Sequence, residues 1–249
     1  MMPGLLDGQV AVVTGGAQGI GLAIAEAITG HGGRVLVADV DGDKAAEAVA
    51  PLASAGAEVA AVACDVTSAA DQEAMIRSCV DRFGRVDLLV NNAGVTRDGY
   101  IAKLDESDFD AVVGVSLKGA WLGTRAVAPL FREQQGGGIV NMSSLSGKVG
   151  NPGQTNYSAA KAGLVGLTKA SAKEMGRFGV RVNAVQPGLV RTAMTLAMKP
   201  EVYAAKEAEV PLGRAGTPEE VAGAVVFLAS PLASYITGSV IEVTGGRGI

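Results

Sequence analysis

Short, nearly uninterrupted apolar runs alternate with longer segments of helical character along almost the entire chain. Apolar runs of this kind are typical of strands that are buried on both faces of a parallel sheet. The predicted strands are Gln9–Thr14, Arg34–Asp39, Glu58–Asp65, Val86–Asn91, Gly138–Ser143, Val180–Gln186 and Ser239–Val243. The predicted helices are Gly19–Thr29, Gly42–Ser54, Ala69–Phe83, Glu106–Gln134, Asn156–Phe178 and Pro218–Ala229. This order predicts an α/β fold, a doubly wound parallel sheet of seven strands with helices on both faces.

The sequence predicts a single domain over residues 1–249. No Pro/Ser-rich linker, compositional break or internal repeat divides it, and 48% apolar against 18% charged residues excludes a disordered chain. One uncharged stretch, Val221–Ile241, has the length of a membrane span. Pro231 and Gly238 interrupt this stretch, and Thr217–Glu220 just before it is a typical helix start. We therefore expect a buried helix and a strand there, and no membrane segment.

Charge and reactive residue types exclude several functions. The net charge of −4 argues against a nucleic-acid surface, which needs clustered positive charge. A Ser-His-Asp hydrolase or a zinc enzyme would have to be built around one histidine, His31, and two cysteines, Cys64 and Cys79. We expect neither, and predict no metal site. Two cysteines outside any CxxC spacing, and an N-terminus without signal-peptide features, indicate a cytoplasmic protein.

A glycine-rich turn connects the first predicted strand to the first predicted helix, with the sequence Thr14-Gly15-Gly16-Ala17-Gln18-Gly19-Ile20-Gly21. Gly15 permits a tight turn, Gly19 lets the backbone approach a pyrophosphate, and Gly21 lets the helix pack closely on the strand. The helix N-terminus offers free N–H groups and about half a positive charge to the phosphates. The turn predicts a dinucleotide site, although a purely structural strand–helix link has the same pattern.

Asp39 ends the second predicted strand, about 20 residues after the glycine turn. A carboxylate there accepts hydrogen bonds from both adenosine ribose hydroxyls and repels a 2′-phosphate. No basic residue offsets this charge at Gln18, Val40 or Asp41, so NAD(H) is favoured over NADP(H). The alternative is that Asp39 is a solvated strand end. Asp65-Val66 and Asn91-Asn92-Ala93-Gly94 end the third and fourth strands at the same ligand-binding edge.

Tyr157 and Lys161 are four residues apart and so lie on one face of a predicted helix. A lysine cation about 5 Å from a phenol is expected to lower the phenol's pKa by about two units from its usual value near 10. Tyr157 would then exchange a proton with a carbinol oxygen, as hydride transfer requires. Ser144, thirteen residues before Tyr157, ends the fifth strand and is suited to hydrogen-bond a carbonyl oxygen.

Together these motifs resemble those of the short-chain dehydrogenases/reductases, over about residues 8 to 246. The glycine turn, the Asn91–Gly94 block, Ser144, the pair Tyr157 and Lys161, and the Asn183–Gly188 block occur in that family's order. Within the superfamily, three blocks are similar to bacterial 3-oxoacyl-(acyl-carrier-protein) reductases: Asn91–Asp98, Gly153–Tyr157 and Tyr235–Gly238. The resemblance implies a Rossmann fold and the interconversion of a ketone and a secondary alcohol with a nicotinamide dinucleotide.

The resemblance also implies roles for individual residues. Tyr157 is the acid/base, Lys161 lowers its pKa and binds the ribose, and Ser144 orients the substrate. The residues implied to line the dinucleotide are Gly15, Gln18, Gly19, Ile20, Gly21, Asp39, Asp65, Val66, Asn92, Ala93, Gly94, Tyr157, Lys161, Pro187, Gly188, Val190 and Thr192. Residues 192–210 correspond to a mobile lid over the substrate, although short amphipathic helices fit that segment equally well. Relatives are commonly tetramers in which long helices pack between subunits, so we expect a homotetramer.

Three features depart from the family. Ser116 stands where relatives usually have a catalytic Asn, which helps hold a water that links the lysine to solvent. Carrier-protein reductases mostly use NADPH, often with a basic residue in the glycine turn, and this chain has a glutamine there. Relatives often dock the acidic carrier protein through arginines at positions that align with Gln135 and Phe178, and here Arg132 and Arg177 lie nearby in the sequence.

These observations favour an NAD(H)-linked reductase of 3-oxoacyl thioesters, carried by acyl carrier protein or coenzyme A. NADP(H) stays open as the cofactor. Within the same enzyme class, the alternative is a dehydrogenase of a free hydrophobic alcohol, steroid, diol or sugar. A third hypothesis is a non-catalytic dinucleotide-binding regulator, against which the intact Ser144, Tyr157 and Lys161 argue. We expect a small-molecule or thioester substrate and no nucleic-acid or membrane partner.

Overall fold

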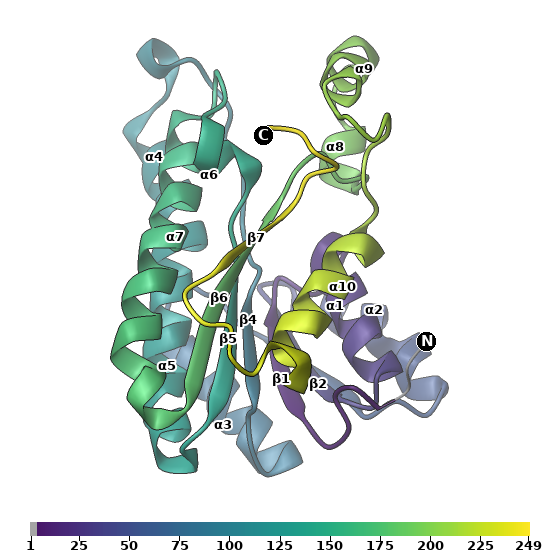
Figure 1. Cartoon of the computed structure of the whole chain (residues 1–249), viewed down its shortest axis with the longest axis vertical. Helices are drawn as coiled ribbons and strands as arrows, with labels where there is room; N and C mark the ends of the chain where they lie inside the picture. Colours follow the sequence, from purple (N-terminus) through teal and green to yellow (C-terminus); the bar gives the residue numbers. More distant parts are fainter. Residues whose placement is uncertain (1–3) are drawn as a thin grey trace.

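Within residues 4–249, which the computed structural model describes, seven strands form one parallel sheet in the order β3–β2–β1–β4–β5–β6–β7 (Figure 1). They are β1 (Val10–Thr14), β2 (Arg34–Asp39), β3 (Val59–Ala63), β4 (Leu88–Asn91), β5 (Gly137–Met142), β6 (Val180–Pro187) and β7 (Val240–Val243). The order changes direction between β1 and β4, which pair directly. The predicted doubly wound sheet is confirmed.

Helices cover both faces of the sheet (Figure 1). One face carries α1 (Gly19–Gly30), α2 (Gly42–Ser54) and α10 (Pro218–Ala229), and the other carries α3 (Ala69–Phe83), α5 (Gly119–Gln134) and α7 (Thr155–Met175). Each face has its own apolar core, which includes Ile24 and Val225 on the first face and Met75 and Phe131 on the second. Burial on both faces explains why the strands are almost continuously apolar in sequence.

The helices α2, α3 and α10 begin and end at the predicted residues. Polar residues cap their starts. The side chains of Asp41, Ser68 and Thr217 each accept a hydrogen bond from a backbone N–H of the first turn. Thr217 and Glu220 form a complete capping box. The uncharged stretch contains most of α10, the 3-10 turn η4 (Pro231–Ala233) and the start of β7. In the described part of the chain, no helix is both long enough and apolar enough to cross a bilayer.

Two predicted helices differ from the structure. Residues 106–134 form α4 (Glu106–Val113), a π-helical turn η2 (Gly114–Lys118) and then α5. The backbone stays right-handed through this turn, with φ −56° at Gly114 and −57° at Gly119, so apolar periodicity does not reveal the change. The predicted helix over residues 156–178 is α7 followed by the 3-10 turn η3 (Gly176–Phe178).

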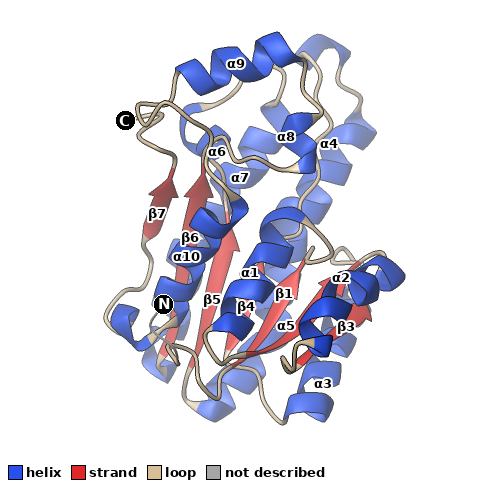
Figure 2. Cartoon of the chain, turned by 90° about the vertical axis from the view of Figure 1, so that its right-hand side faces the viewer, coloured by secondary structure: helices blue, strands red, loops and turns tan. Residues whose placement is uncertain are grey.

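Short helices lie at the carboxyl ends of the strands. They are α6 (Leu145–Val149), α8 (Ala193–Leu196) and α9 (Pro200–Ala208), and Figure 2 shows α8 and α9 above the strand tips. A 3-10 turn, η1 (Ile101–Lys103), follows β4 and precedes α4. Open α/β sheets bind ligands at this edge, where the strand order reverses. The fold therefore brings the ends of β1, β2, β4 and β5 together at one place.

Candidate active site

The glycine turn between β1 and α1 accepts only glycine at three positions. Gly15 and Gly19 have φ of 63° and 57°, in the left-handed region that disfavours side chains. A Cβ on Gly21 would lie 2.3 Å from the carbonyl oxygen of Gly15, and a Cβ on Gly15 would lie 2.8 Å from Ala93 Cα. The N-cap residue Gln18 makes no side-chain capping bond to α1, so the first backbone N–H groups of that helix remain available to an anion. This cradle fits a dinucleotide pyrophosphate.

The end of β4 is fastened to the glycine turn across the point where the strand order reverses. The backbone N–H groups of Asn92 and Ala93 donate to Thr14 Oγ1 at 3.0 and 3.1 Å. The Asn92 side-chain amide donates to the carbonyl oxygens of Thr14 and Gly15 at 2.9 and 3.0 Å. The predicted cofactor residues of both strand ends therefore form one rigid rim.

Asp39 lies at the same rim, on the other side of the glycine turn. Its Oδ2 accepts from the backbone N–H of Ala17 at 3.1 Å, which fixes the carboxylate beside the turn. One cation borders the same turn, because Lys44 Nζ donates to Gln18 Oε1 at 2.6 Å. Lys44 stands 26 residues from Gln18, in the first turn of α2, where its backbone N–H donates to the capping residue Asp41. Asp65 follows β3 at the same edge, where its Oδ1 accepts from Thr67.

The later cofactor residues return to the same turn. A Cβ on Gly188 would lie 2.9 Å from Thr244 Cα, so the chain after β6 passes tightly against the end of β7. Val190 forms an isolated bridge with Gly216. Thr192 caps α8, and its Cγ2 would lie 3.8 Å from a Cβ on Gly19. The segment that leads into α8 therefore borders the pyrophosphate cradle.

Lys161 is buried within the candidate site, with 4% of its surface exposed. Its Nζ donates to the backbone carbonyl of Met142 at 2.7 Å and lies 5.5 Å from the centre of the Tyr157 ring. Tyr157 and Lys161 therefore lie on the same face of α7, as predicted. Burial lowers the pKa of Lys161 from 10.5 to about 8, because the charged ammonium loses its hydration.

The pKa of Tyr157 is raised, which corrects the expectation that Lys161 would lower it. Burial of the phenol is the largest cause, the Ser144 hydrogen bond acts in the opposite direction, and the negative charge of Asp98 raises the pKa further. Lys161 donates to a backbone carbonyl and is itself buried, and the desolvation of the phenol has the largest effect on the pKa of Tyr157. The Tyr157 phenol therefore keeps its proton.

Ser144 faces Tyr157 from the start of α6. Its Oγ accepts from the backbone N–H of Ser146 at 3.2 Å, which makes it the N-cap of that short helix. A Cβ on Gly147 would lie 2.6 Å from the backbone carbon of Lys161, so α6 packs directly on α7. The fold thus brings Ser144, Tyr157 and Lys161 together, as the sequence analysis expected.

Ser116 lies in the π-helical turn, beside Lys161. A Cβ on Gly94 would lie 3.3 Å from Lys161 Nζ and 3.4 Å from Ser116 Oγ, so both polar groups border the same glycine. Ser116 is buried, and its hydroxyl has no hydrogen-bond partner among residues 4–249. A buried hydroxyl without a protein partner is suited to hold a water.

Sequence reasoning did not single out Lys44, Asp98 or Gln154 as site residues. Gln154 donates to both carboxylate oxygens of Asp98, 56 residues away, and Lys44 reaches Gln18 across 26 residues. No short spacing marks such pairs. The available indications were the position of Lys44 in the first turn of a predicted helix, and that of Gln154 three residues before Tyr157.

Known proteins resemble this chain along nearly its whole length. A family model described as enoyl-(acyl carrier protein) reductase matches residues 15–247. An uncharacterized oxidoreductase of Mycobacterium bovis is 56% identical over 99% of both chains. The 3-oxoacyl-[acyl-carrier-protein] reductase of Synechocystis is 45% identical over 97% of both chains, and that of Thermotoga maritima is 42% identical over 97% of this chain and 98% of its own. The crystal structure of gox2181 has a TM-score of 0.95 at 39% identity, over 97% of this chain and 96% of that one. The chain therefore belongs to the short-chain dehydrogenase/reductase superfamily, and it is an oxidoreductase.

Proposed function

We propose that the protein reduces the ketone of a 3-oxoacyl thioester to a secondary alcohol, with NADH as the hydride donor. The observation that carries this proposal is the meeting of Ser144, Tyr157 and Lys161 at the strand edge that also holds the glycine cradle. Relatives at 41–45% identity bear the name of 3-oxoacyl-[acyl-carrier-protein] reductase. The alternative substrate is a free hydrophobic ketone or alcohol. It stays open because the name of the 56% identical relative, an oxidoreductase, specifies no substrate.

The chain's own residues are suited to hold the dinucleotide in an extended pose along the rim. The N–H groups at the start of α1 would bind the pyrophosphate, Asp39 the adenosine ribose, and Lys161 the nicotinamide ribose. Gln18, Ile20, Asp65, Val66, Asn92, Ala93, Gly94, Pro187, Gly188, Val190 and Thr192 would border it. When bound, the nicotinamide supplies the hydride for the reduction.

Tyr157 donates the proton that the reduced carbonyl oxygen requires. The raised pKa of its phenol favours this direction, because the proton stays in place until the oxygen becomes basic. The Lys161 ammonium, 5.5 Å from the ring centre, stabilises the phenolate that remains. Ser144 donates a hydrogen bond to the substrate oxygen and so stabilises its developing charge. Ser116 holds a water through which Lys161 exchanges protons with solvent.

Residues 192–210 form the lid of the substrate site. Met194 and Leu196 on α8 are more than half exposed, with 53% and 62% of their surfaces accessible. An acyl chain or a hydrophobic ketone would cover them, which gains about 25 cal/mol for each Å² removed from water. The lid and the sheet together make one domain.

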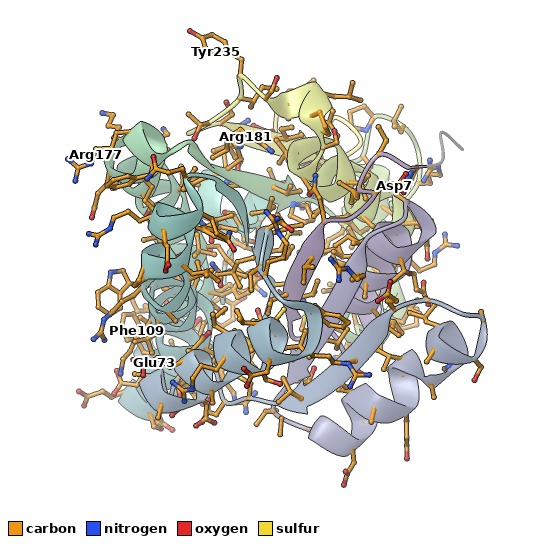
Figure 3. The ribbon with its side chains drawn as sticks, turned by 90° about the horizontal axis from the view of Figure 1, so that it is seen from below. Asp7, Glu73, Phe109, Arg177, Arg181 and Tyr235 are labelled. Atoms are coloured by element: carbon orange, nitrogen blue, oxygen red, sulfur yellow. The ribbon has the colours of Figure 1, made fainter. Side chains whose placement is uncertain are left out.

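Two measurements test the proposed function. Consumption of NADH and NADPH is followed spectrophotometrically with acetoacetyl-CoA and with a panel of free ketones, and we expect turnover with the thioester and NADH. Tyr157→Phe should reduce turnover to background while leaving NADH affinity within about threefold, since only the proton donor is lost. Tyr235→Phe, which alters a fully exposed tyrosine (Figure 3), should retain wild-type turnover. Reduction of free ketones alone would favour the alternative, and a fully active Tyr157→Phe would refute the assigned proton donor.

A further inference from the structure

A carboxylate whose charge acts on the Tyr157 phenol is held in place by a buried amide. Gln154 Nε2 donates to both carboxylate oxygens of Asp98, at 3.1 and 3.0 Å. Gln154 is buried and is the N-cap residue of α7, so it lies one helical turn before Tyr157. Asp98 itself is exposed. Its charge is therefore open to whatever enters the site.

Gln154 has little freedom to release Asp98. Its Oε1 accepts from Asn151 Nδ2 at 2.7 Å and from Ser146 Oγ at 3.3 Å, so both ends of the amide are engaged. Ser146 belongs to α6, whose N-cap is Ser144. The amide thus connects the loop of Asp98, the loop of Asn151 and helix α6.

The loop that carries Asp98 is also fixed. The backbone N–H of Gly99 donates to Gly153 O at 2.9 Å, and Asn156 Nδ2 donates to Arg97 O at 2.9 Å. The residues on both sides of Asp98 are therefore bonded to the segment that begins α7. The position of the Asp98 carboxylate is therefore fixed both by its own bonds and by those of its chain neighbours.

No cation neutralises this carboxylate within the described residues. Arg97, its chain neighbour, lies 3.9 Å from Asp108 on α4, and Lys148 on α6 lies 2.8 Å from Glu242 on β7. Lys161 on α7 is buried against the Met142 carbonyl. Among the described residues, Asp98 raises the pKa of Tyr157 through its negative charge, and the Lys161 ammonium lies 5.5 Å from the ring centre.

We propose that Asp98, held by Gln154, determines substrate specificity. It admits neutral 3-oxo compounds, including thioesters, and excludes free 3-oxo acids because of their carboxylate. This inference rests on the proposed function. A free 3-oxo acid carries its negative charge two bonds from the carbonyl that accepts the proton, and so close to Asp98. Like charges at such distances repel strongly in a partly desolvated site. A thioester at the same position is neutral and escapes this repulsion.

The test compares two substrates that differ only in that charge, acetoacetate and the acetoacetyl thioester of N-acetylcysteamine. For Asp98→Asn, the ratio of kcat/KM for acetoacetate to that for the thioester should rise about tenfold over wild type. Asn retains one amide oxygen for Gln154, so one of the two hydrogen bonds persists without the charge. Asp105→Asn removes another exposed carboxylate, one that makes no capping bond to α4, and should leave the ratio unchanged.

A pH profile separates the electrostatic role from a structural one. In Asp98→Asn, the alkaline limb of the thioester rate should move to lower pH, because the phenol loses a neighbouring negative charge. Asp98→Glu should restore both the discrimination and the profile. If Asp98→Asn is unstable, Asp98→Ser serves the same comparison.

Each outcome bears on one hypothesis. An unchanged substrate ratio together with an unchanged pH profile overturns the role of Asp98. Failure of the wild-type protein to reduce the thioester contradicts the proposed function instead. In that case the same charge comparison is made with a neutral ketone and a ketone of equal size that bears a carboxylate.

Discussion

Lys161 imposes an electrostatic cost on the folded protein. Its ammonium is buried, and its pKa falls from 10.5 to about 8. Between these two values the unfolded chain binds a proton that the folded chain has released, so stability rises with pH through this window. Below about pH 8 both states are charged and the full cost of burying the ammonium remains.

Lys161→Met should therefore change the pH dependence of stability. Relative to this variant, the free energy of unfolding of the wild type should rise by about 2 kcal/mol between pH 8 and 9.5, at about 1.4 kcal/mol per pKa unit. Urea unfolding at several pH values measures this difference. Lys169→Met, an exposed lysine on the same helix, should show no such trend. Parallel curves for wild type and Lys161→Met would contradict the buried charge.

Asp39 should control the choice between NADH and NADPH. We expect the wild type to bind NADH at least tenfold more tightly, because the carboxylate repels a 2′-phosphate more strongly than the single cation Lys44 attracts it. Asp39→Ala combined with Val40→Arg should reverse this order in calorimetric titrations. Asp43→Asn, on the first turn of α2, is the matched control. Tighter binding of NADPH by the wild type would show that Asp39 does not set the preference.

At the scale of elements, the π-helical turn places Ser116 beside Lys161. Ser116→Ala should lower kcat about tenfold and leave NADH affinity unchanged, because the variant loses only the hydroxyl that we propose to hold a relay water. Stopped-flow turnover and cofactor titration measure the two quantities. Ser116→Asn, which supplies the amide usual in relatives, should retain or exceed wild-type kcat. A wild-type rate in Ser116→Ala would mean that the side chain is idle.

The C-terminal segment is bonded to residues 209 and 212, at the end of the proposed lid. Arg247 Nε lies 2.8 Å from Glu209 Oε2, just after α9, and Leu212 N donates to Gly245 O at 3.1 Å. Arg247→Ala should speed hydrogen exchange in residues 193–208 and raise KM for the thioester about threefold, without changing NADH affinity. Arg77→Ala, which breaks the exposed pair with Glu73 on α3, should change neither quantity. Unaltered exchange in the lid would show that the ion pair does not hold it.

Elements whose starts carry polar caps could be predicted to the residue, as α2, α3 and α10 show. The π-helical turn could not, because an extra residue in one turn leaves the apolar stripe almost unchanged. The sequence does not decide between a mobile lid and short helices at α8 and α9, because these helices are short and partly polar. At the site, the four-residue spacing placed Tyr157 against Lys161 correctly. The pKa shift was predicted with the wrong sign, because burial depends on the packing of α6 against α7.

At the scale of the whole molecule, the two arginines considered for carrier docking lie far from the chain's own active site. Arg132 is in the last turn of α5 and Arg177 follows α7, and both ends lie at the amino-end edge of the parallel strands. Twenty residues of helix separate Tyr157 from Arg177, which amounts to about 30 Å. Figure 3, which views this edge, shows Arg177 at the periphery. A carrier bound there would not deliver its substrate to Tyr157 of the same chain.

We expect the groove that contains these arginines to pack against a second copy of the chain. It runs between α5 and α7 and is lined by apolar residues together with the arginines, including Trp121, Pro129, Met175 and Phe178. Trp121 is 49% exposed, and the Arg125 guanidinium lies 5.9 Å from its ring centre. A half-exposed tryptophan on a long helix is typical of an interface centre.

Trp121→Glu should therefore break the assembly. We expect wild type to run as four chains in size-exclusion chromatography with light scattering, and the variant as dimers or monomers, because a symmetric tetramer contains more than one kind of interface. Val40→Glu, which places the same charge at an exposed residue outside the groove, should leave the mass unchanged. A tetrameric Trp121→Glu would place the interface elsewhere and leave the groove free for a carrier protein, and a monomeric wild type would exclude the assembly altogether.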